Sequence, residues 1–277
     1  MSVVINTNYA AVLARKNLAE VQRQMDKSVE RLSSGKRINN ASDDAAGSAI
    51  AGRMESQIRG LTMGIRHAKD GQSLVATSEG AMQEINKMLQ RMRELAVQAA
   101  SGVANNSDKD YLNLEMKQLV SQVDAISKNT KFNDQALLEG GTFKFYTDID
   151  VAGSAITTDG ADMAASALAV SALTVSIGGG VVQAEISSVV SAIDNALAVV
   201  DNRRAALGAV SNRFDHIIDN LQNVIMNTVQ SKSRIVDADF SIETTNLTRN
   251  TVLQQAATSM LAQANAQKNS VLALIQQ

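Results

Sequence analysis

Few side chains in this sequence of 277 residues are suited to catalysis or to metal binding. The chain has two histidines, His67 and His216, and no cysteine. Imidazole and thiolate are the usual zinc ligands and the usual partners in nucleophilic catalysis, so either kind of site would have little to be built from. Both histidines fall outside the apolar stripes of the predicted helices, which places them at the surface. We therefore predict that the protein is not an enzyme and holds no metal ion or cofactor.

Two acidic clusters and one glycine run are the remaining candidates for ligand binding. The acids within 43–44 and 237–239 could hold a cation, but acids beside predicted helix starts are better explained by their interaction with the helix dipole. The glycines at 178–180 lack the following Lys and Ser or Thr of a phosphate-binding loop, and they predict a tight turn. The chain carries 26 Lys and Arg against 28 Asp and Glu, so no basic surface predicts a nucleic-acid partner.

No segment has the composition of a membrane helix or of a cleaved signal. Residues 163–184 carry no charge, but Ser, Gly and Ala dominate there and the glycine run lies among them. The N-terminal stretch has no basic region followed by a sustained apolar core before Arg15 and Lys16. We expect neither membrane insertion nor signal cleavage.

Apolar residues recur at spacings of three, four and seven along most of the chain, which is typical of coiled-coil helices. The sequence contains no proline, the residue that most strongly interrupts a helix. Ser42 and, in a capping box with Asp110, Ser107 are candidate N-caps. The short turn near 101–107 makes the second and third helices an antiparallel hairpin. The predicted helices lie near 4–33, from Ser42 to about Ala100, from Ser107 through Ile126, around 193–224, and from about Ser241 onward.

Residues 132–187 change from the heptad pattern to one typical of strands. Phe143 and Phe145 alternate with polar neighbours, and Asp159-Gly160 is a common hairpin-turn sequence. Alternating apolar residues recur from Leu173. The fold class that follows is mainly α, with long antiparallel coiled-coil helices and a small β-hairpin region near 140–187 in the middle of the chain.

Both ends of the chain carry an apolar stripe, and the C-terminal end is poor in charge. Beyond Asp239 the only charged residues are Glu243, Arg249 and Lys268. A helix without a solvating face is marginal by itself, so neighbours must bury it. An ordinary bundle core explains any single stripe, but stripes at both ends predict an assembly module whose termini self-associate. The residues predicted to pack in this inner layer and subunit interface are Leu18, Met25, Leu32, Leu253, Met260, Val271 and Leu274.

Several long segments, in the same order, resemble bacterial flagellins. They are INTNYAAVLARKNL, ERLSSGKRINNASDDAAGSAIAGRM, DGQSLVATSEGAMQEINKMLQRMRELAVQAA, LGAVSNRFDHIIDNL and VLQQAATSMLAQANAQKNSVLALI. The resemblance covers about residues 1–140 and 190–277. It implies terminal helices at 1–42 and 234–277 that form an inner coiled-coil layer, and a helical middle domain at 43–233. The middle is short, so the chain is similar to a minimal flagellin that lacks large outer variable domains.

The same resemblance implies a function, a location and partners. The chain would be the structural subunit of the helical flagellar filament used for swimming motility, outside the cell, with terminal coiled coils that drive assembly. It would pass through the flagellar type III export apparatus without signal cleavage, and a chaperone would bind its C-terminal helix. Other copies of the chain, the filament cap and the hook-junction proteins are further implied partners.

The nearest alternative to a flagellin is a hook–filament junction protein, whose family more often has Pro after the Ser-Asp-Asp stretch, where this chain has Ala45. A coiled-coil signalling hairpin would need a membrane span or anchor, and a hydrolase would need a catalytic constellation. Neither feature is evident in the sequence.

The segment QRMRELAV, at 90–97, resembles the motif through which many flagellins engage the vertebrate innate immune receptor for flagellin. By that resemblance the contact patch comprises Gln90, Arg91, Leu95 and Glu115. Arg91 and Leu95 lie four residues apart on one helical face, and the turn after them brings Glu115 back alongside. Alternatively, Arg91 and Glu115 pair across the hairpin while Leu95 covers an edge of the core.

Overall fold

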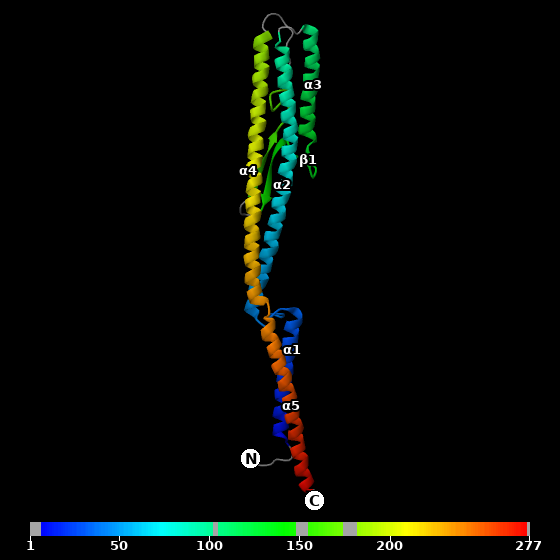
Figure 1. Cartoon of the computed structure of the whole chain (residues 1–277), viewed down its shortest axis with the longest axis vertical. Coiled ribbons are helices and arrows are strands. Elements are labelled where there is room, and N and C mark those ends of the chain that lie inside the picture. The colour runs from blue at the N-terminus through cyan, green and yellow to red at the C-terminus, as the bar shows by residue number, and fades with distance from the viewer. Residues whose placement is uncertain (1–6, 102–104, 148–154, 174–181, 276–277) are drawn as a thin grey trace. The chain divides into compact units, whose positions relative to one another are not determined.

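The computed structural model describes residues 7–101, 105–147, 155–173 and 182–275, without the side chains of 182–184 and 268–275. The helices among them are α1 (Tyr9–Ser34), α2 (Ala45–Ala99), α3 (Asn106–Asn129), α4 (Val182–Val236) and α5 (Phe240–Ile275), as Figure 1 shows. The strands are β1 (Lys131–Phe132), β2 (Gln135–Ala136), β3 (Glu139–Tyr146) and β4 (Ala155–Asp162). The predicted fold class, long helices with a small β region in the middle of the chain, is confirmed.

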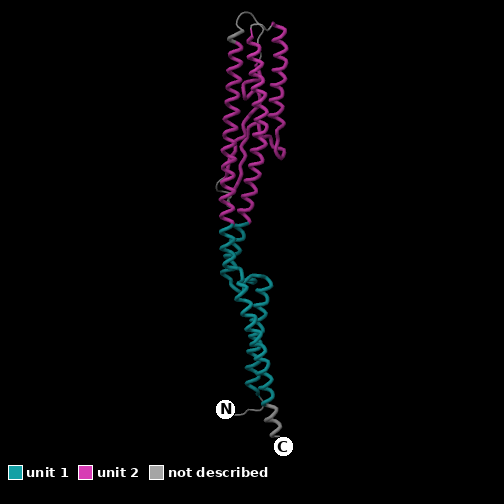
Figure 2. Tube along the Cα trace, in the orientation of Figure 1, with its two compact units in different colours: residues 1–58, 226–277 teal, residues 59–225 magenta. Residues whose placement is uncertain are grey.

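The chain divides into two compact units (Figure 2). Unit 1 comprises residues 1–58 and 226–277, and unit 2 comprises residues 59–225. Helices α1 and α5 belong to unit 1, α3 and the strands belong to unit 2, and α2 and α4 contribute to both. The predicted inner layer, 1–42 with 234–277, falls within unit 1, and the division of the chain into assembly layers stays a prediction.

The first helix, predicted near 4–33, is Tyr9–Ser34 in the structure, so it begins later than predicted and ends within one residue of the prediction. Asn8 accepts a hydrogen bond from the backbone N–H of Ala11 at 3.1 Å, which satisfies one of the free donors at the start of α1. At the other end, Gly35 has a φ of 69° and donates its N–H to the carbonyl oxygen of Arg31 at 2.8 Å. The left-handed conformation favours glycine there, so α1 ends at Ser34, one residue beyond the predicted end.

Two predicted N-caps are wrong by two residues each. Helix α2 is capped by Asp44, which accepts a backbone N–H hydrogen bond at 2.9 Å, and not by Ser42. Helix α3 is capped by Asn105, which forms a capping box with Asp108, and not by Ser107. Asn, Asp and Ser cap helices about equally well, so residue type alone does not choose among neighbouring candidates.

The β region consists of two small antiparallel pairs. The turn between β1 and β2 is formed by Asn133 and Asp134, whose φ values of 49° and 62° are left-handed. Asn and Asp tolerate this conformation, which matches the twist of the flanking strands. The pair of β3 and β4 is longer and places Phe145 opposite Ile156. Residues 163–173 form turns without a strand, and the alternation predicted beyond them lies outside the described residues.

Asp159-Gly160 is not the hairpin turn that its sequence suggests. Both residues lie inside β4, where Gly160 is opposite Gly141. A Cβ atom on Gly160 would lie 3.0 Å from the carbonyl oxygen of Leu137 and 3.1 Å from that of Gly141. The position requires glycine because other backbone segments approach it closely, and not because the chain turns there.

The apolar core lies in unit 2, between α2, α3, α4 and the strands. Ile85 and Leu89 of α2 and Phe214 of α4 are completely buried. The Phe214 ring packs edge-on against Phe145, with ring centroids 5.6 Å apart. It also lies over Gly71 of α2, where an added Cβ would be 2.5 Å from the ring. The ring therefore links both long helices to the β3–β4 pair.

Helices α2 and α4 are joined by polar contacts in a single antiparallel register. The contacts are Gln72 with Asp215 at 2.6 Å, Asn86 with Asp201 at 2.9 Å, and Arg93 with Asp194 at 2.7 Å. The steps from one contact to the next are whole heptads on both helices. That equality is typical of a coiled coil, whose facing residues recur with a heptad period.

Candidate functional site

The candidate site is the antiparallel pair of terminal helices, α1 and α5, in unit 1. Among the described residues, side-chain hydrogen bonds cross this pair at its two ends and near its middle. They join Asn8 Nδ2 to the Ala264 carbonyl oxygen at 3.0 Å, Gln254 Nε2 to Gln22 Oε1 at 2.7 Å, and Arg31 Nη1 to Glu243 Oε1 at 2.9 Å. As the contacts move toward the N-terminus of α1, they move toward the C-terminus of α5.

The most deeply buried side chains of this helix pair are polar. Ser28, Glu243 and Asn250 are each 5% exposed. Beside them lies a surface pocket of ≈ 260 Å³ that is also lined by Arg31 and Leu253. Burying polar groups costs free energy unless they are hydrogen-bonded. The interior of the pair is therefore poorly suited to hold the two helices together on its own.

The exterior of the same pair carries large apolar side chains. The exposed fractions are 78% for Tyr9, 64% for Val12, 70% for Phe240, and 59% for both Ile242 and Val252. Single exposed apolar residues are common, but an exterior that gathers so many is typical of an interaction surface. The pair therefore buries several polar side chains while several of its large apolar ones stay exposed.

The residues that the sequence predicts for the interface lie in two different environments. Leu18, Met25 and Leu32 of α1 are half-buried. Leu253 and Met260 of α5 are 44% and 61% exposed. Val271 and Leu274 lie within α5, but their side chains are outside the described part of the chain. Their shared role in assembly stays a prediction.

Sequence reasoning missed two sets of residues at this site. One set is the exposed apolar side chains off the heptad stripe, such as Val12 and Phe240. The sequence does contain a sign of these residues, because an apolar residue on the helix face opposite the heptad stripe has no partner within the helix pair. The other set is the buried polar residues, such as Glu243 and Asn250. No pattern marks a polar residue as buried before the helix that covers it is known.

A charged loop joins α1 to α2 within unit 1. Asp43 accepts hydrogen bonds from the backbone N–H groups of Asn39 and Asn40, both at 3.2 Å, and pairs with Lys27 Nζ at 2.8 Å. The Lys27 hydrogen bond, followed by the two backbone donors, lowers the pKa of Asp43 from 3.8 to about 2. The sequence predicts Asp43 in the first turn of a helix. In the structure Asp43 lies in the loop before α2, which begins at Ala45, and accepts hydrogen bonds from that loop.

The second predicted patch, in unit 2, brings its charged residues together but buries Leu95. Arg91 Nε donates to Glu115 Oε1 at 2.8 Å across the α2–α3 hairpin, and this bond raises the pKa of Arg91. Gln90 is exposed and donates to Asn86 Oδ1 at 2.7 Å. Leu95 is completely buried, so its side chain packs into the core. The assignment of these residues to a receptor stays a prediction.

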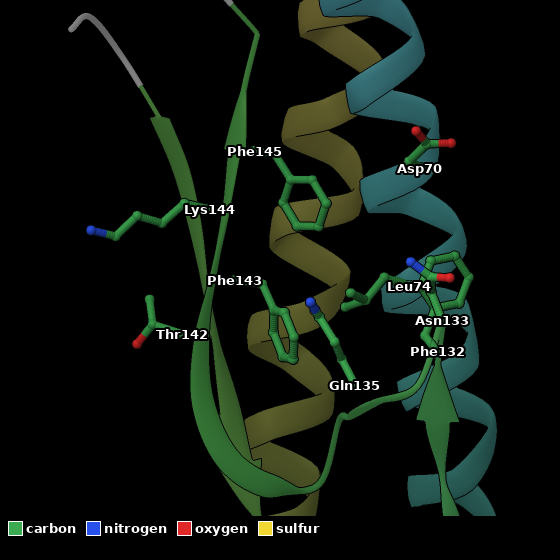
Figure 3. Close-up of a pocket in the computed structure, with 9 residues that line it drawn as sticks. All are labelled: Asp70, Leu74, Phe132, Asn133, Gln135, Thr142, Phe143, Lys144 and Phe145. Atoms are coloured by element: carbon green, nitrogen blue, oxygen red, sulfur yellow. The ribbon is translucent and has the colours of Figure 1, made fainter. Parts of the chain in front are cut away.

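A surface pocket of ≈ 630 Å³ lies between α2, the β1–β2 turn and β3 (Figure 3). Phe143 and Phe145 turn toward the helices whereas Thr142 and Lys144 turn away, which confirms the predicted alternation. Asp70 is the one carboxylate among the residues that line the pocket. A single acid without a neighbouring base does not make an acid–base pair, so we assign no reaction to this pocket.

In the described part of the chain, no group of three or more metal-ligating side chains comes together. None of its helices is long and apolar enough to cross a membrane. His67 and His216 are both exposed, as the sequence predicts.

Two family models match this chain. The model of the bacterial flagellin N-terminal helical region matches residues 5–142, and that of the bacterial flagellin C-terminal helical region matches residues 190–275. A flagellin of Halalkalibacterium halodurans is 40% identical over 276 residues, which cover 99% of this chain and 100% of the relative. A flagellin of Treponema pallidum is 34% identical over 285 residues, with the same coverage.

Solved structures with similar folds include two flagellar proteins. Bacillus cereus flagellin is 29% identical, with a TM-score of 0.47 over 56% of this chain and 88% of that chain. A putative flagellar hook-associated protein from Vibrio parahaemolyticus aligns with a TM-score of 0.59 over 70% of this chain and 100% of that chain. Its identity to this chain is 14%, so it is similar in fold alone.

Proposed function

Because this chain belongs to the bacterial flagellin family, we propose that it is the structural subunit that polymerises into the helical flagellar filament used for swimming motility. It matches relatives named flagellin over their full length. The family is structural, and its role is assembly and not catalysis. The observation that extends this role to particular residues is the set of large apolar side chains that the α1–α5 pair leaves exposed.

Assembly through these helices follows from burial of the apolar exterior. Each large apolar side chain that moves from water into a subunit contact contributes about 1.5–3 kcal/mol when fully buried. Leu253 and Met260 are exposed in the single chain, so this contribution is available only when another copy covers them. A patch that meets a different patch on the next copy generates an open helical array, because the contact does not close on itself.

Seeded polymerisation of α5 variants tests this mechanism. Leu253→Gln and Met260→Gln should each raise the critical concentration for filament growth by about tenfold, the equivalent of about 1.4 kcal/mol. Circular dichroism of the free chains should be unchanged, because neither side chain is buried in the chain itself. Gln263→Ser, at an exposed polar position of the same helix, is the matched control and should polymerise normally. Normal growth of both α5 variants would contradict the mechanism.

A hook–filament junction protein is the alternative role. Relatives named flagellin that align over their whole length favour the filament subunit instead. Electron microscopy of the purified chain after depolymerisation and reseeding separates the two roles. Long filaments of this chain alone are expected from a filament subunit, and their absence would favour the junction role.

The proposed route to the filament is export by the flagellar type III apparatus, without signal cleavage, to the outside of the cell. A chaperone that covers α5 would prevent premature association, since its exposed apolar residues would otherwise meet other copies. The filament cap and hook-junction proteins are proposed partners at the filament ends. Met260→Gln should weaken binding of the full chain to the chaperone, whereas the control Gln263→Ser should not.

Recognition by the vertebrate innate immune receptor for flagellin is a further proposal, supported by the juxtaposition of Arg91 with Glu115. In a receptor-reporter assay, Arg91→Ala and Glu115→Ala monomers should signal less than the parent and keep their fold, because both side chains are about half exposed. Leu95→Ala needs a separate stability measurement, since emptying a buried leucine site costs about 2–5 kcal/mol. Undiminished signalling by both charge variants would reject the patch.

A further inference from the structure

Both helices of the α1–α5 pair contribute polar residues to the surface pocket of ≈ 260 Å³ that lies between them. On α1 these residues are Gln24, Lys27, Ser28 and Arg31. On α5 they are Glu243, Asn246, Arg249 and Asn250, followed by the apolar Leu253. Within each helix, spacings of three, four and seven residues place these side chains on one face. The pocket is therefore built from two facing stripes, and we call it the polar pocket.

Two side chains that line the polar pocket are buried and have no hydrogen-bond partner. Ser28 and Asn250 are each 5% exposed. Within the described part of the chain, neither side chain forms a hydrogen bond. Buried polar groups in folded proteins are nearly always hydrogen-bonded. An occupant of the polar pocket is expected to supply the missing partners, and an acceptor oxygen suits both the amide N–H groups of Asn250 and the hydroxyl of Ser28.

The charges around the polar pocket favour an anion. Its lining carries three cations against one carboxylate. Glu243 is paired with Arg31 at 2.9 Å, and Lys27 is paired with Asp43 at 2.8 Å. Arg249 has neither a hydrogen bond nor an ion pair among the described residues, so its charge is the one left uncompensated. A concave site with an excess of one sign of charge concentrates ions of the opposite sign.

Other classes of ligand fit the polar pocket less well. An apolar molecule would meet a single apolar side chain, Leu253, among the residues that line it. A cation would meet a single carboxylate, which is already paired with Arg31. Water satisfies Ser28 and Asn250 but brings no charge to Arg249. An oxyanion does both, because its oxygens accept several hydrogen bonds and match the planar donors of a guanidinium group.

We propose that the polar pocket binds one oxyanion group, a phosphate or a carboxylate. Arg249 supplies the charge and its planar donors, and Ser28 and Asn250 supply neutral donors. The oxyanion can come from two sources, a free inorganic anion or an Asp or Glu side chain of a second copy of this chain. Binding of the free anion does not depend on the proposed filament role.

Titration of the full chain with sodium phosphate tests the site, with pH held constant and with sodium chloride used to hold the ionic strength constant. The readout is the side-chain amide signals of Asn246 and Asn250 in ¹H–¹⁵N spectra. These signals should shift and saturate, whereas the side-chain amide signal of Gln72 in unit 2 should not move. Saturation is the mark of a defined site, because general screening by salt changes gradually with concentration.

Three variants locate the binding. Arg249→Gln should bind phosphate about tenfold more weakly, because it loses a charge-assisted hydrogen bond at an exposed position that the fold does not need. Asn250→Leu, followed through the Asn246 signal, should also bind about tenfold more weakly. The matched control is Arg15→Gln, which removes an exposed arginine of α1 outside the polar pocket and should bind like the parent.

Seeded filament growth identifies the source of the oxyanion. If the natural occupant is a carboxylate of a second copy, phosphate at its saturating concentration should compete for the polar pocket and slow growth of the parent. Unchanged growth with saturable binding would support a free anion instead. Both results support the proposed chemistry, and the binding titration stands even if this chain forms no filament.

Several results of the titration would overturn the proposal. One is a shift that rises without saturation, and another is equal binding by the parent and Arg249→Gln. Undiminished binding by Asn250→Leu would place the anion outside the polar pocket. Coil-like signals from α1 and α5 in the parent would also overturn the proposal, because the free chain would then not form the pocket.

Discussion

Unit 2 and the terminal pair of unit 1 differ in which side chains they bury most deeply. In unit 2, residues such as Ile85, Leu89 and Phe214 are 0% exposed. In the described part of unit 1, the most deeply buried apolar residues are 7% exposed, and Glu243 and Asn250 are more deeply buried than any of them. The helices of unit 2 therefore enclose an apolar core, whereas the most deeply buried residues of the α1–α5 pair are polar.

The difference indicates which unit can complete its fold within one chain. Burial of apolar surface is the dominant favourable contribution to folding, and unit 2 achieves it internally. The terminal pair leaves much of its apolar surface in water, so its stability should depend on other copies of the chain. Substitutions of the same kind should therefore act on folding in unit 2 and on assembly in unit 1.

The largest expected effect comes from truncating one phenylalanine in each unit. Phe214→Ala should lower the free energy of unfolding of the free chain by about 3–5 kcal/mol, because it empties a completely buried ring site. Phe240→Ala should change it by less than about 0.5 kcal/mol, because this ring is 70% exposed. Chemical denaturation followed by circular dichroism measures both changes.

Polymerisation completes the Phe214 and Phe240 comparison. Phe240→Ala should slow seeded filament growth although the free chain is as stable as the parent. If Phe240→Ala instead destabilised the free chain as much as Phe214→Ala, the terminal pair would be part of one monomeric core. The contrast between the two units would then fail.

The sequence predicts this contrast only in part. Heptad spacing predicts the helices, and the low charge beyond Asp239 predicts that the last helix needs neighbours. A stripe does not tell whether its residues face a partner within the chain or in another copy. Leu18 and Leu253 belong to the same predicted interface, yet the first is half-buried by the pair and the second is exposed. That difference depends on which faces of two helices distant in sequence meet.

Adding one methyl group to glycines of α2 should separate tight packing from open helix surface. Gly71→Ala should destabilise unit 2 by about 1–3 kcal/mol, because the new Cβ would meet the fixed Phe214 ring. Gly80→Ala should stabilise it by up to about 1 kcal/mol, because nothing lies within 4 Å and alanine is the better helix former.

A third glycine extends this test to unit 1. Gly52 also has nothing within 4 Å of its added Cβ, so Gly52→Ala should favour the helix without disturbing the core of unit 2. Thermal unfolding of the three variants measures the effects. A gain in stability from Gly71→Ala would show that the Phe214 ring is not held in place, against the account of a rigid core.

Helix caps offer a smaller and more balanced comparison. Asp44→Ala in unit 1 and Asn105→Ala in unit 2 each remove a side-chain acceptor at a helix start. Each should cost about 1 kcal/mol of helix stability. Hydrogen exchange of the first turns of α2 and α3 should rise in the respective variant. A cost confined to Asn105→Ala would indicate that unit 1 is not folded in the free chain.

The sequence predicts some polar contacts of the two units better than others. Asp43 was assigned to a helix start, whereas it binds Lys27 and two loop amides. The sequence predicts an Arg91–Glu115 ion pair across the hairpin as one of two interpretations, and the structure contains that pair. That contact follows from one short turn between neighbouring helices, whereas the position of Lys27 beside Asp43 depends on how the loop folds back along α1.

The smallest expected effect is the pH response of the loop in unit 1. The folded state holds the pKa of Asp43 at about 2, below its ordinary value of 3.8, so folding favours the ionised carboxylate. This contribution is fully present above pH 3.8 and is lost as the pH falls toward about 2, when the folded state also takes up the proton.

NMR titration of the Asp43 carboxyl carbon measures the pKa directly. Lys27→Met removes the largest cause of the shift but keeps the amides of Asn39 and Asn40, so the pKa should rise to a value between those two limits. Salt should have a similar but weaker effect, because the pair lies near solvent. An unchanged pKa in Lys27→Met would assign the shift to the loop backbone alone, and unit 1 would then lose its charge link between α1 and the start of α2.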